Sequence, residues 1–204
     1  MTTPNPYAHR TAQHFDGIRY DEALIQKYNR QGPRYTSYPT ALEFVPIEQG
    51  VEAQILANRN PSIPLSLYIH IPFCHHLCYY CGCNKIITKK NSDAGDYLTY
   101  LFAEIRHKKS LLRGKTWVKQ LHLGGGTPTF LSDDELITLW DFLHEEFLFA
   151  DEGDFSIEID PRELRPNTLK ILKDLGFNRL SFGVQDLDKK VQIAVNRVQS
   201  LELI

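Results

Sequence analysis

Apolar residues recur along this chain with two periods, one typical of buried strands and one typical of helices. The runs with strand character are Leu65–Ile71, Val118–Leu123, Phe155–Ile159 and Arg179–Val184. The segments with helical spacing are Asp93–Leu112, a stretch from Ser132 to near Phe147, Asn167–Leu175 and Asp188–Asn196. Strands that alternate with helices at this spacing predict right-handed βαβ units around a parallel sheet, in the α/β class.

Short polar signals indicate where two of these helices begin. Ser132 and Glu135 stand three residues apart before an apolar run, which is the pattern of a capping box. We expect Ser92 or Asp93 to cap the preceding helix, because Ser and Asp side chains accept hydrogen bonds from free backbone N–H groups.

Composition divides the chain into three parts. Residues 1–17 are polar and are predicted to be disordered. Residues 18–63 form a helical and loop element with helical patterns over Tyr20–Asn29 and Ile47–Asn58. Residues 64–204 carry the strands and helices of the predicted sheet.

Bulk properties exclude several function classes. A formal net charge of −2 and a pI near 6.4 give no bulk electrostatic case for a nucleic-acid partner. The first residues lack the apolar core of a signal peptide. No run approaches the roughly 18 apolar residues that a membrane helix needs. We therefore expect a cytoplasmic protein of a reducing compartment.

All four cysteines lie in one short segment directly after the first predicted strand. Cys74 and Cys78 are separated by three residues, and Cys78 and Cys81 by two, with Cys83 just beyond. Iron–sulfur centres are normally held by cysteine sulfur, and a loop of this length can wrap three thiolates around one cubane cluster. If three of four irons take a protein thiolate, the remaining iron is open to another ligand.

Other interpretations of the cysteines stay open. A zinc site with His70, His75 or His76 is chemically possible, but structural zinc usually takes a second, distant pair of ligands, which this chain lacks. A disulfide framework is less favoured in a chain of this length without a secretion signal. Cys83 is either a fourth ligand or a thiol near the site. We expect His75 and His76 to face solvent.

Polar and glycine residues follow the carboxyl ends of the predicted strands. They are the cysteine loop, Gly124–Pro128, Glu158 with Asp160, and Gln185 with Asp186. In β/α sheets and barrels this edge is where ligands bind. The strands therefore point at one site. Whether His122 faces that site or the helices is left open by the pattern.

Two of these segments have distinct binding chemistry. The run Gly124–Gly126 does not match a phosphate loop, but its bare backbone can hydrogen-bond a ligand directly. Glu158 faces away from its two isoleucine neighbours and can accept hydrogen bonds from ribose hydroxyls or an ammonium group. The alternative is an ion pair of Glu158 with Arg162 or Arg179.

The cysteine spacing also resembles a known signature. Cys74-x-x-x-Cys78-x-Tyr80-Cys81 is similar to the motif of the radical S-adenosylmethionine (SAM) enzymes. The longer run from Tyr68 to Lys85, which includes Cys83, resembles the oxygen-independent coproporphyrinogen III oxidases. The segment from Arg34 to Thr40 resembles the N-terminal element of the same family.

The resemblance implies a fold, cofactors and ligands. The fold is a partial (β/α) barrel of the radical SAM type with parallel strands, preceded by a helical N-terminal element. Cys74, Cys78 and Cys81 hold a [4Fe-4S] cluster, Cys83 is not a ligand, and two molecules of SAM bind. The residues that match SAM-binding positions are Tyr68, Tyr80, Gly125, Gly126, Thr127, Glu158, Gln185 and Arg197. No catalytic side chain is assigned.

The implied reaction is oxidative decarboxylation. Reductive cleavage of SAM gives a 5′-deoxyadenosyl radical, which takes hydrogen from the β-carbon of a substrate propionate. Loss of carbon dioxide and one electron leaves a vinyl group, and two rounds convert coproporphyrinogen III to protoporphyrinogen IX. The implied partners are the porphyrinogen and a reductase-type electron donor, with a monomer as the full-length state.

The chain is shorter than members of the family that it resembles, and two other functions remain as alternatives. Members of that family are longer, and the amphipathic ending Ser200–Ile204 looks like the start of a further helix. We expect a front portion that turns over substrate poorly by itself. A radical SAM-like haem chaperone shares the cysteine loop and the glycine motif, although Cys83 and the Arg34–Thr40 element favour the oxidase. A zinc-binding structural protein is the other alternative.

Overall fold

The computed structural model describes residues 20–30 and 40–204, and these fall into two compact units, Met1–Pro46 and Ile47–Ile204. In the first unit, helix α1 (Glu22–Tyr28) begins at Asp21, whose side chain accepts a hydrogen bond of 3.0 Å from the Leu24 N–H. A short 3-10 helix, η1, spans Ala41–Glu43. The expectation of disorder over residues 1–17 lies outside the described residues.

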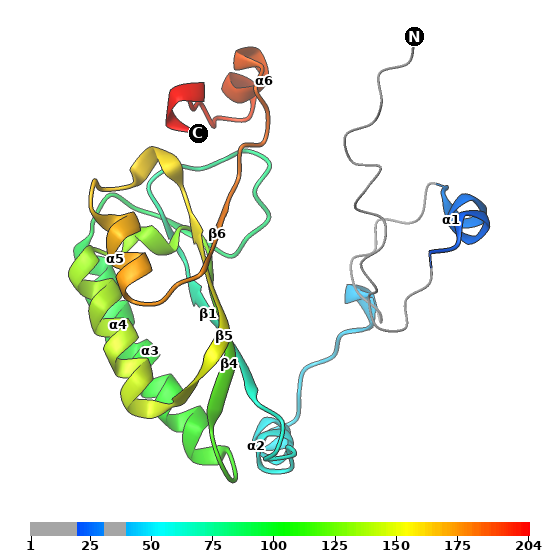
Figure 1. The fold of residues 1–204 in the computed structure, drawn as a ribbon, viewed down its shortest axis with the longest axis vertical. Coiled ribbons are helices and arrows are strands. Elements are labelled where there is room, and N and C mark those ends of the chain that lie inside the picture. Colours follow the sequence, from blue (N-terminus) through cyan, green and yellow to red (C-terminus); the bar gives the residue numbers. More distant parts are fainter. Residues whose placement is uncertain (1–19, 31–39) are drawn as a thin grey trace. The chain divides into compact units, whose positions relative to one another are not determined.

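The second unit is built on a parallel sheet with the strand order β1-β4-β5-β6. These strands are β1 (Leu65–Ile71), β4 (Trp117–Gly125), β5 (Leu148–Ile159) and β6 (Arg179–Phe182). The helices that connect them are α3 (Ser92–Leu111), α4 (Asp133–Glu146) and α5 (Thr168–Asp174), and all three lie on the same side of the sheet (Figure 1). Spatial order that follows chain order, with helical crossovers, confirms the predicted first part of a (β/α) barrel.

Shorter elements surround this frame. They are α2 (Val51–Ala57), β2 (Phe73–Cys74), β3 (Ile86–Ile87), η2 (Pro128–Phe130), η3 (Pro161–Glu163), α6 (Lys189–Ala194) and η4 (Leu201–Leu203). The two-residue strands β2 and β3 pair in parallel around the cysteine segment and were not predicted, because such short strands leave no periodic signal. None of the described helices is both long and apolar enough to cross a bilayer.

Two details of the prediction are wrong. Strand β5 begins at Leu148 rather than Phe155, because its first residues pair with the start of β4. The pairing has a register irregularity between Val118 and Gln120, and the two strands pair regularly again after it. Neither Ser92 nor Asp93 caps α3. Asn91 holds the cap position without a side-chain bond, and Asp93 accepts a hydrogen bond from Thr88 instead.

The core lies between the sheet and its helices. The fully buried side chains of the strands are Ile71, Val118, Leu121, Leu123 and Ile157, and those of the helices include Leu136, Leu139 and Leu143 of α4 and Leu172 of α5. The predicted capping box is present: Ser132 accepts from the Glu135 N–H at 3.2 Å, and Glu135 accepts from the Ser132 N–H at 2.8 Å. This box starts α4 where its apolar face meets the sheet.

The opposite face of the sheet is polar, and its residues line up across the strands. The register places Tyr68 beside His122, His122 beside Ser156, and Ser156 beside Arg179. Because side chains alternate along a strand, this row faces away from the buried isoleucines and leucines. Two residues further along, Glu158 stands beside Ser181 on the same face. The sheet thus separates an apolar side from a polar side.

Replacing Ile157 with alanine tests whether β5 is the centre of this core. Ile157 has no exposed surface, so Ile157→Ala is expected to lower the free energy of unfolding by about 2–5 kcal/mol. The matched control is Leu148→Ala on the same strand, where 64% of Leu148 is exposed and the change is expected to stay within about 0.5 kcal/mol. Equal effects of the two substitutions in urea unfolding would contradict this packing.

Candidate functional site

A cavity of about 310 Å³ opens at the carboxyl ends of the parallel strands. Every residue that the sequence assigned to a cluster or to SAM lines this cavity, with the exception of Tyr68. Those residues are Cys74, Cys78, Tyr80, Cys81, Gly125, Gly126, Thr127, Glu158, Gln185 and Arg197. The cavity also includes Asp160, which the sequence placed at this edge without a role, and Lys85, Arg162 and Glu163, which it had not assigned to the site.

The cysteine segment is fastened to the ends of neighbouring strands by backbone bonds. The Gly126 N–H donates to the Ile71 carbonyl, and the Thr127 N–H donates to the Phe73 carbonyl, both at 2.8 Å. On the other side of the segment, Lys85 donates to the carbonyls of Cys81 at 3.0 Å and Cys83 at 3.3 Å. The first two bonds hold the residues after β4 against the end of β1 and the start of the cysteine segment, and the Lys85 bonds close that segment on itself.

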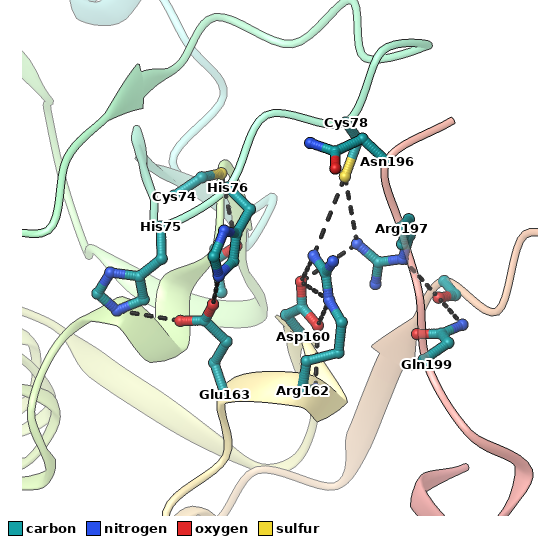
Figure 2. Close-up of polar contacts among 12 residues, drawn as sticks. Cys74, His75, His76, Cys78, Asp160, Arg162, Glu163, Asn196, Arg197 and Gln199 are labelled. Carbon is teal, nitrogen blue, oxygen red and sulfur yellow. Dashed lines mark hydrogen bonds and ion pairs between the residues drawn. The ribbon is translucent and has the colours of Figure 1, made fainter. Parts of the chain in front are cut away.

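The C-terminal segment adds a second attachment. Asn196 donates from its side-chain amide to the Leu77 carbonyl at 2.7 Å, and the Tyr79 N–H donates to the Val195 carbonyl at 3.0 Å. Residues far apart in the sequence therefore close the same loop, and Figure 2 shows Asn196 beside Cys78. The backbone of Asn196 has φ of 55°, a left-handed conformation that asparagine tolerates better than most residues.

Glu163 anchors the loop through two consecutive histidines. The expectation that both face solvent holds for His76, whose side chain is 52% exposed, but not for His75, whose side chain is 25% exposed. Its carboxylate lies 3.0 Å from His75 Nε2 and 3.3 Å from His76 Nε2, one oxygen for each ring (Figure 2). Only 16% of the Glu163 side chain is exposed. The carboxylate comes from η3, just after β5, so it ties the loop after β1 to the loop after β5.

The thiols differ in their surroundings, and none forms a disulfide. Burial raises the pKa of Cys74, while the Thr127 hydroxyl, which donates to its sulfur at 3.5 Å, opposes that rise. Cys78 is buried, and two guanidinium groups approach its sulfur. Cys83 is exposed at the cavity wall, and partial burial of its sulfur raises its pKa.

Burial of two tyrosines also affects their acidity. It raises the pKa of Tyr80 to about 12 and raises the pKa of Tyr68 above its usual value. Both phenols are therefore neutral donors at physiological pH. Tyr80 lies in the cysteine loop as the aromatic residue of the motif, whereas Tyr68 lies on β1 just outside the cavity lining.

Hydrogen bonds determine which nitrogen of His70 carries the proton. His70 Nε2 lies 2.8 Å from the Asn84 carbonyl, an acceptor, so Nε2 must donate. His70 Nδ1 is then the acceptor for the Tyr68 hydroxyl at 3.0 Å. His70 thus links β1 to the end of the cysteine loop, which is a positioning role for this histidine.

The orientation of His122, which the sequence left open, is toward the polar face. Its Nδ1 lies 2.7 Å from the Ser156 hydroxyl and its Nε2 lies 3.4 Å from Glu158, and the ring stacks on Tyr68. Glu158 also accepts a bond of 3.3 Å from the Gly125 N–H. The alternative partners for Glu158 are wrong, because Arg162 pairs with Asp160, and Arg179 with Asp154.

Two glycines are required by close approach of neighbouring groups. Gly125 has φ of 115°, and a Cβ there would lie 2.7 Å from the His70 ring. A Cβ at Gly126 would lie 2.7 Å from the Phe73 carbonyl oxygen, which is backbone and cannot move aside easily. The glycine run therefore does more than form a turn, because the absence of side chains lets the backbone after β4 pack directly against the cysteine segment.

Asp160 holds two arginines at the floor of the cavity. The carboxylate accepts from Arg162 Nη2 at 2.5 Å and from Arg197 Nη1 at 3.2 Å (Figure 2). Burial alone would raise the pKa of Asp160, but the two guanidinium groups outweigh burial and hold that pKa below its usual value. Arg197 is also bound to the Gly183 carbonyl at 3.2 Å, and only 9% of the residue is exposed.

The residues around the cavity fit an iron–sulfur cluster. All four free thiols line the cavity. Beside Cys78, the two arginines exceed the Asp160 carboxylate by one positive charge, which suits a group made anionic by thiolates. Within residues 20–30 and 40–204, no three His, Cys, Asp or Glu side chains stand close enough together to hold one metal ion.

Comparison with known proteins agrees with the fold. Residues 68–204 match the model of the radical SAM superfamily. This chain belongs to that superfamily.

Individual proteins with high sequence identity to this chain share one name. A protein of Salmonella typhimurium is 54% identical over 188 residues, which are 92% of this chain and 41% of the relative. A protein of Mannheimia haemolytica is 50% identical over 144 residues, which are 71% of this chain and 98% of the relative. Both are named oxygen-independent coproporphyrinogen III oxidase.

A solved structure supports the same relationship. Coproporphyrinogen III oxidase from Escherichia coli, described as a radical SAM enzyme, superposes with a TM-score of 0.77 at 49% sequence identity. The superposition covers 91% of this chain and 41% of that structure. The chain thus spans less than half the length of the Salmonella and Escherichia proteins that it matches.

Glu163→Gln tests the anchoring of the cysteine loop. Glutamine keeps one acceptor oxygen and turns the other into a donor, so one of the two histidines loses its partner. We expect alkylation of Cys74 in the cluster-free protein to become about fivefold faster, as a loss of about 1 kcal/mol would give.

The matched control is Glu145→Gln on the exposed face of α4. Labelling rates of individual cysteines, measured by mass spectrometry, should be the same for this control and the unmodified protein. If Glu163→Gln labels no faster than Glu145→Gln, the carboxylate does not hold the loop.

Proposed function

We propose that this chain carries the cluster- and SAM-binding part of an oxygen-independent coproporphyrinogen III oxidase of anaerobic haem biosynthesis. The observation that carries the proposal is the convergence of three free cysteines, the Gly125–Thr127 backbone and Glu158 on one cavity. These groups come from the ends of β1, β4 and β5. The names of the relatives support the same activity.

Cys74, Cys78 and Cys81 are the proposed ligands of a [4Fe-4S] cluster. Together with bound SAM, such a cluster supplies one-electron cleavage of a carbon–sulfur bond and a carbon-centred radical. This chain contributes the loop that presents the three sulfurs, with Lys85 holding the backbone at Cys81 and Cys83. We assign Cys83 no ligand role.

The SAM contacts follow the same strand ends. Gly125, Gly126 and Thr127 expose backbone groups suited to the amino end of SAM, and the Glu158 carboxylate suits ribose hydroxyls or the ammonium group. Contacts with the Gly125 N–H and with His122 fix the position of the Glu158 carboxylate. Tyr68 and Tyr80 offer ring faces and phenol groups beside this position.

Gln185 and Arg197 are the proposed contacts to a second SAM molecule. Gln185 has φ of 67°, an uncommon conformation for a residue with a side chain, and such strain tends to occur at functional sites. Arg197 is buried against Asp160, and its guanidinium borders the cavity. A buried, fixed guanidinium is well suited to recognise a carboxylate.

The reaction removes the carboxyl group of a propionate side chain. One hydrogen atom leaves the β-carbon, and the substrate then loses carbon dioxide and one electron, which leaves a vinyl group. A reductase-type protein supplies the electron that starts each round, and the full-length protein acts as a monomer in the cytoplasm. The residues of this chain position the reactants and keep water away from the radical.

The first test is anaerobic reconstitution of the protein, at its full natural length, with iron and sulfide. We expect a brown protein whose reduced EPR signal changes on addition of SAM and which converts coproporphyrinogen III to protoporphyrinogen IX. Replacing Cys74, Cys78 or Cys81 with alanine should each abolish the cluster, whereas Cys83→Ala should retain its iron and sulfide.

Other outcomes distinguish the alternatives. Tight haem binding without decarboxylation would identify a haem chaperone. A colourless protein with one zinc and no affinity for SAM would remove the radical chemistry altogether.

Glu158→Gln tests the SAM contact. Loss of a charge-assisted hydrogen bond is expected to weaken SAM binding about tenfold or more. Glu152→Gln, an exposed position on the same strand, is the control and should bind SAM normally. Equal dissociation constants for the two variants, measured by anaerobic equilibrium dialysis, would show that Glu158 does not contact SAM.

A further inference from the structure

The sulfur of Cys78 has a distinctive environment among the cysteines of the cavity. Arg162 Nη2 lies 4.0 Å from the Cys78 sulfur, and Arg197 Nη1 lies 3.7 Å from it (Figure 2). Both distances fall within the range of an N–H group donating to sulfur, which is a larger atom than oxygen. The two guanidinium groups reach the sulfur from below, where the loop after β5 meets the C-terminal segment.

Arg162 is held in this position by its own carboxylate partner. The side chain donates to Asp160 through Nε at 2.9 Å and through Nη2 at 2.5 Å, and its backbone N–H donates to the same carboxylate at 3.1 Å. Only 15% of the side chain is exposed. A guanidinium held by Nε and Nη2 to one carboxylate, which the backbone N–H of the same residue also binds, has little freedom to turn away from the sulfur.

The local charge favours a negative sulfur. The guanidinium of Arg162 is charged at any physiological pH, and it lies within hydrogen-bonding distance of the Cys78 sulfur. Arg162 and Arg197 together carry one more charge than Asp160 neutralises. Reduction by one electron makes a thiolate-bound cluster more negative, and donors to its sulfurs stabilise that state.

We propose that Arg162 is a positioning residue that tunes the cluster: its guanidinium donates a hydrogen bond to the Cys78 sulfur and raises the reduction potential. This inference rests on the proposed cluster at Cys74, Cys78 and Cys81. The electron comes from the reductase-type donor and enters the cluster, and no atom of Arg162 is transferred. A more easily reduced cluster lets a donor of moderate potential start the reaction.

The test is the midpoint potential of the cluster in the reconstituted full-length protein, measured by EPR in the absence of SAM. Arg162→Lys retains the positive charge but loses the planar fork that reaches Asp160 and the sulfur together. Arg162→Gln loses the charge as well. We expect Arg162→Lys to lower the equilibrium constant for reduction about tenfold, which is about 59 mV for a one-electron couple, and Arg162→Gln to lower it further.

Arg165→Lys is the matched control. Arg165 comes from the same segment and also pairs with a carboxylate, since its Nη2 lies 2.7 Å from Asp133. Its other hydrogen bonds go to the carbonyls of Thr129 and Leu131 and not to a cysteine sulfur. Its midpoint should equal that of the unmodified protein. Because a midpoint is read only from loaded molecules, lower cluster content in a variant does not affect the result.

Resonance Raman spectra give a second readout. Loss of a donor to Cys78 should raise an iron–cysteine stretching frequency in Arg162→Lys but not in Arg165→Lys. If Arg162→Lys and the unmodified protein share one midpoint and one spectrum, the hydrogen bond is absent and the inference is wrong. A protein that never takes up iron would overturn the proposed function and this inference together, whereas a shifted midpoint in a protein without decarboxylase activity would overturn only the function.

Discussion

The register of the parallel sheet is the constraint on which the rest of the structure depends. Because β1, β4 and β5 run in the same direction and pair in register, their carboxyl ends reach the same edge. The cysteine loop, the glycine run and the Glu158–Glu163 segment therefore meet, although they are far apart in the sequence. A shift of one residue in β5 would turn Glu158 into the apolar layer and an isoleucine onto the polar face.

Charge organises the site once the backbone has brought it together. Asp160 and Glu163 follow β5 closely, yet they act on different partners. Glu163 holds the two histidines beside Cys74, and Asp160 holds the two arginines beneath Cys78. The short segment that contains Asp160 and Glu163 thus contacts the cysteine loop at two points and sets the charge around the Cys78 sulfur. The same residues therefore stabilise the loop and determine the electrostatic surroundings of the proposed cluster.

Several parts of the fold were predictable because they depend on local pattern. The capping box of Ser132 and Glu135 and the alternation of Ile157, Glu158 and Ile159 require only neighbouring residues. The extra length of β5 was not predictable, since the polar Asp151 and Glu152 conceal a strand that exists by pairing with β4. The pairing of His75 and His76 with Glu163 was also missed, because a contact between two loops leaves no spacing to detect.

The sequence by itself determined the alternation of strands and helices and the close spacing of the cysteines and of the glycine run, because spacing and periodicity are properties of adjacent residues. The resemblance of these motifs to radical SAM enzymes indicated the class of the protein. Only the tertiary structure decided that His122 faces Glu158, that Arg162 serves Asp160 rather than Glu158, and that Arg162 and Arg197 share one carboxylate below Cys78. These outcomes depend on strand register and on which charges are buried together, and neither is encoded in the spacing of residues along the chain.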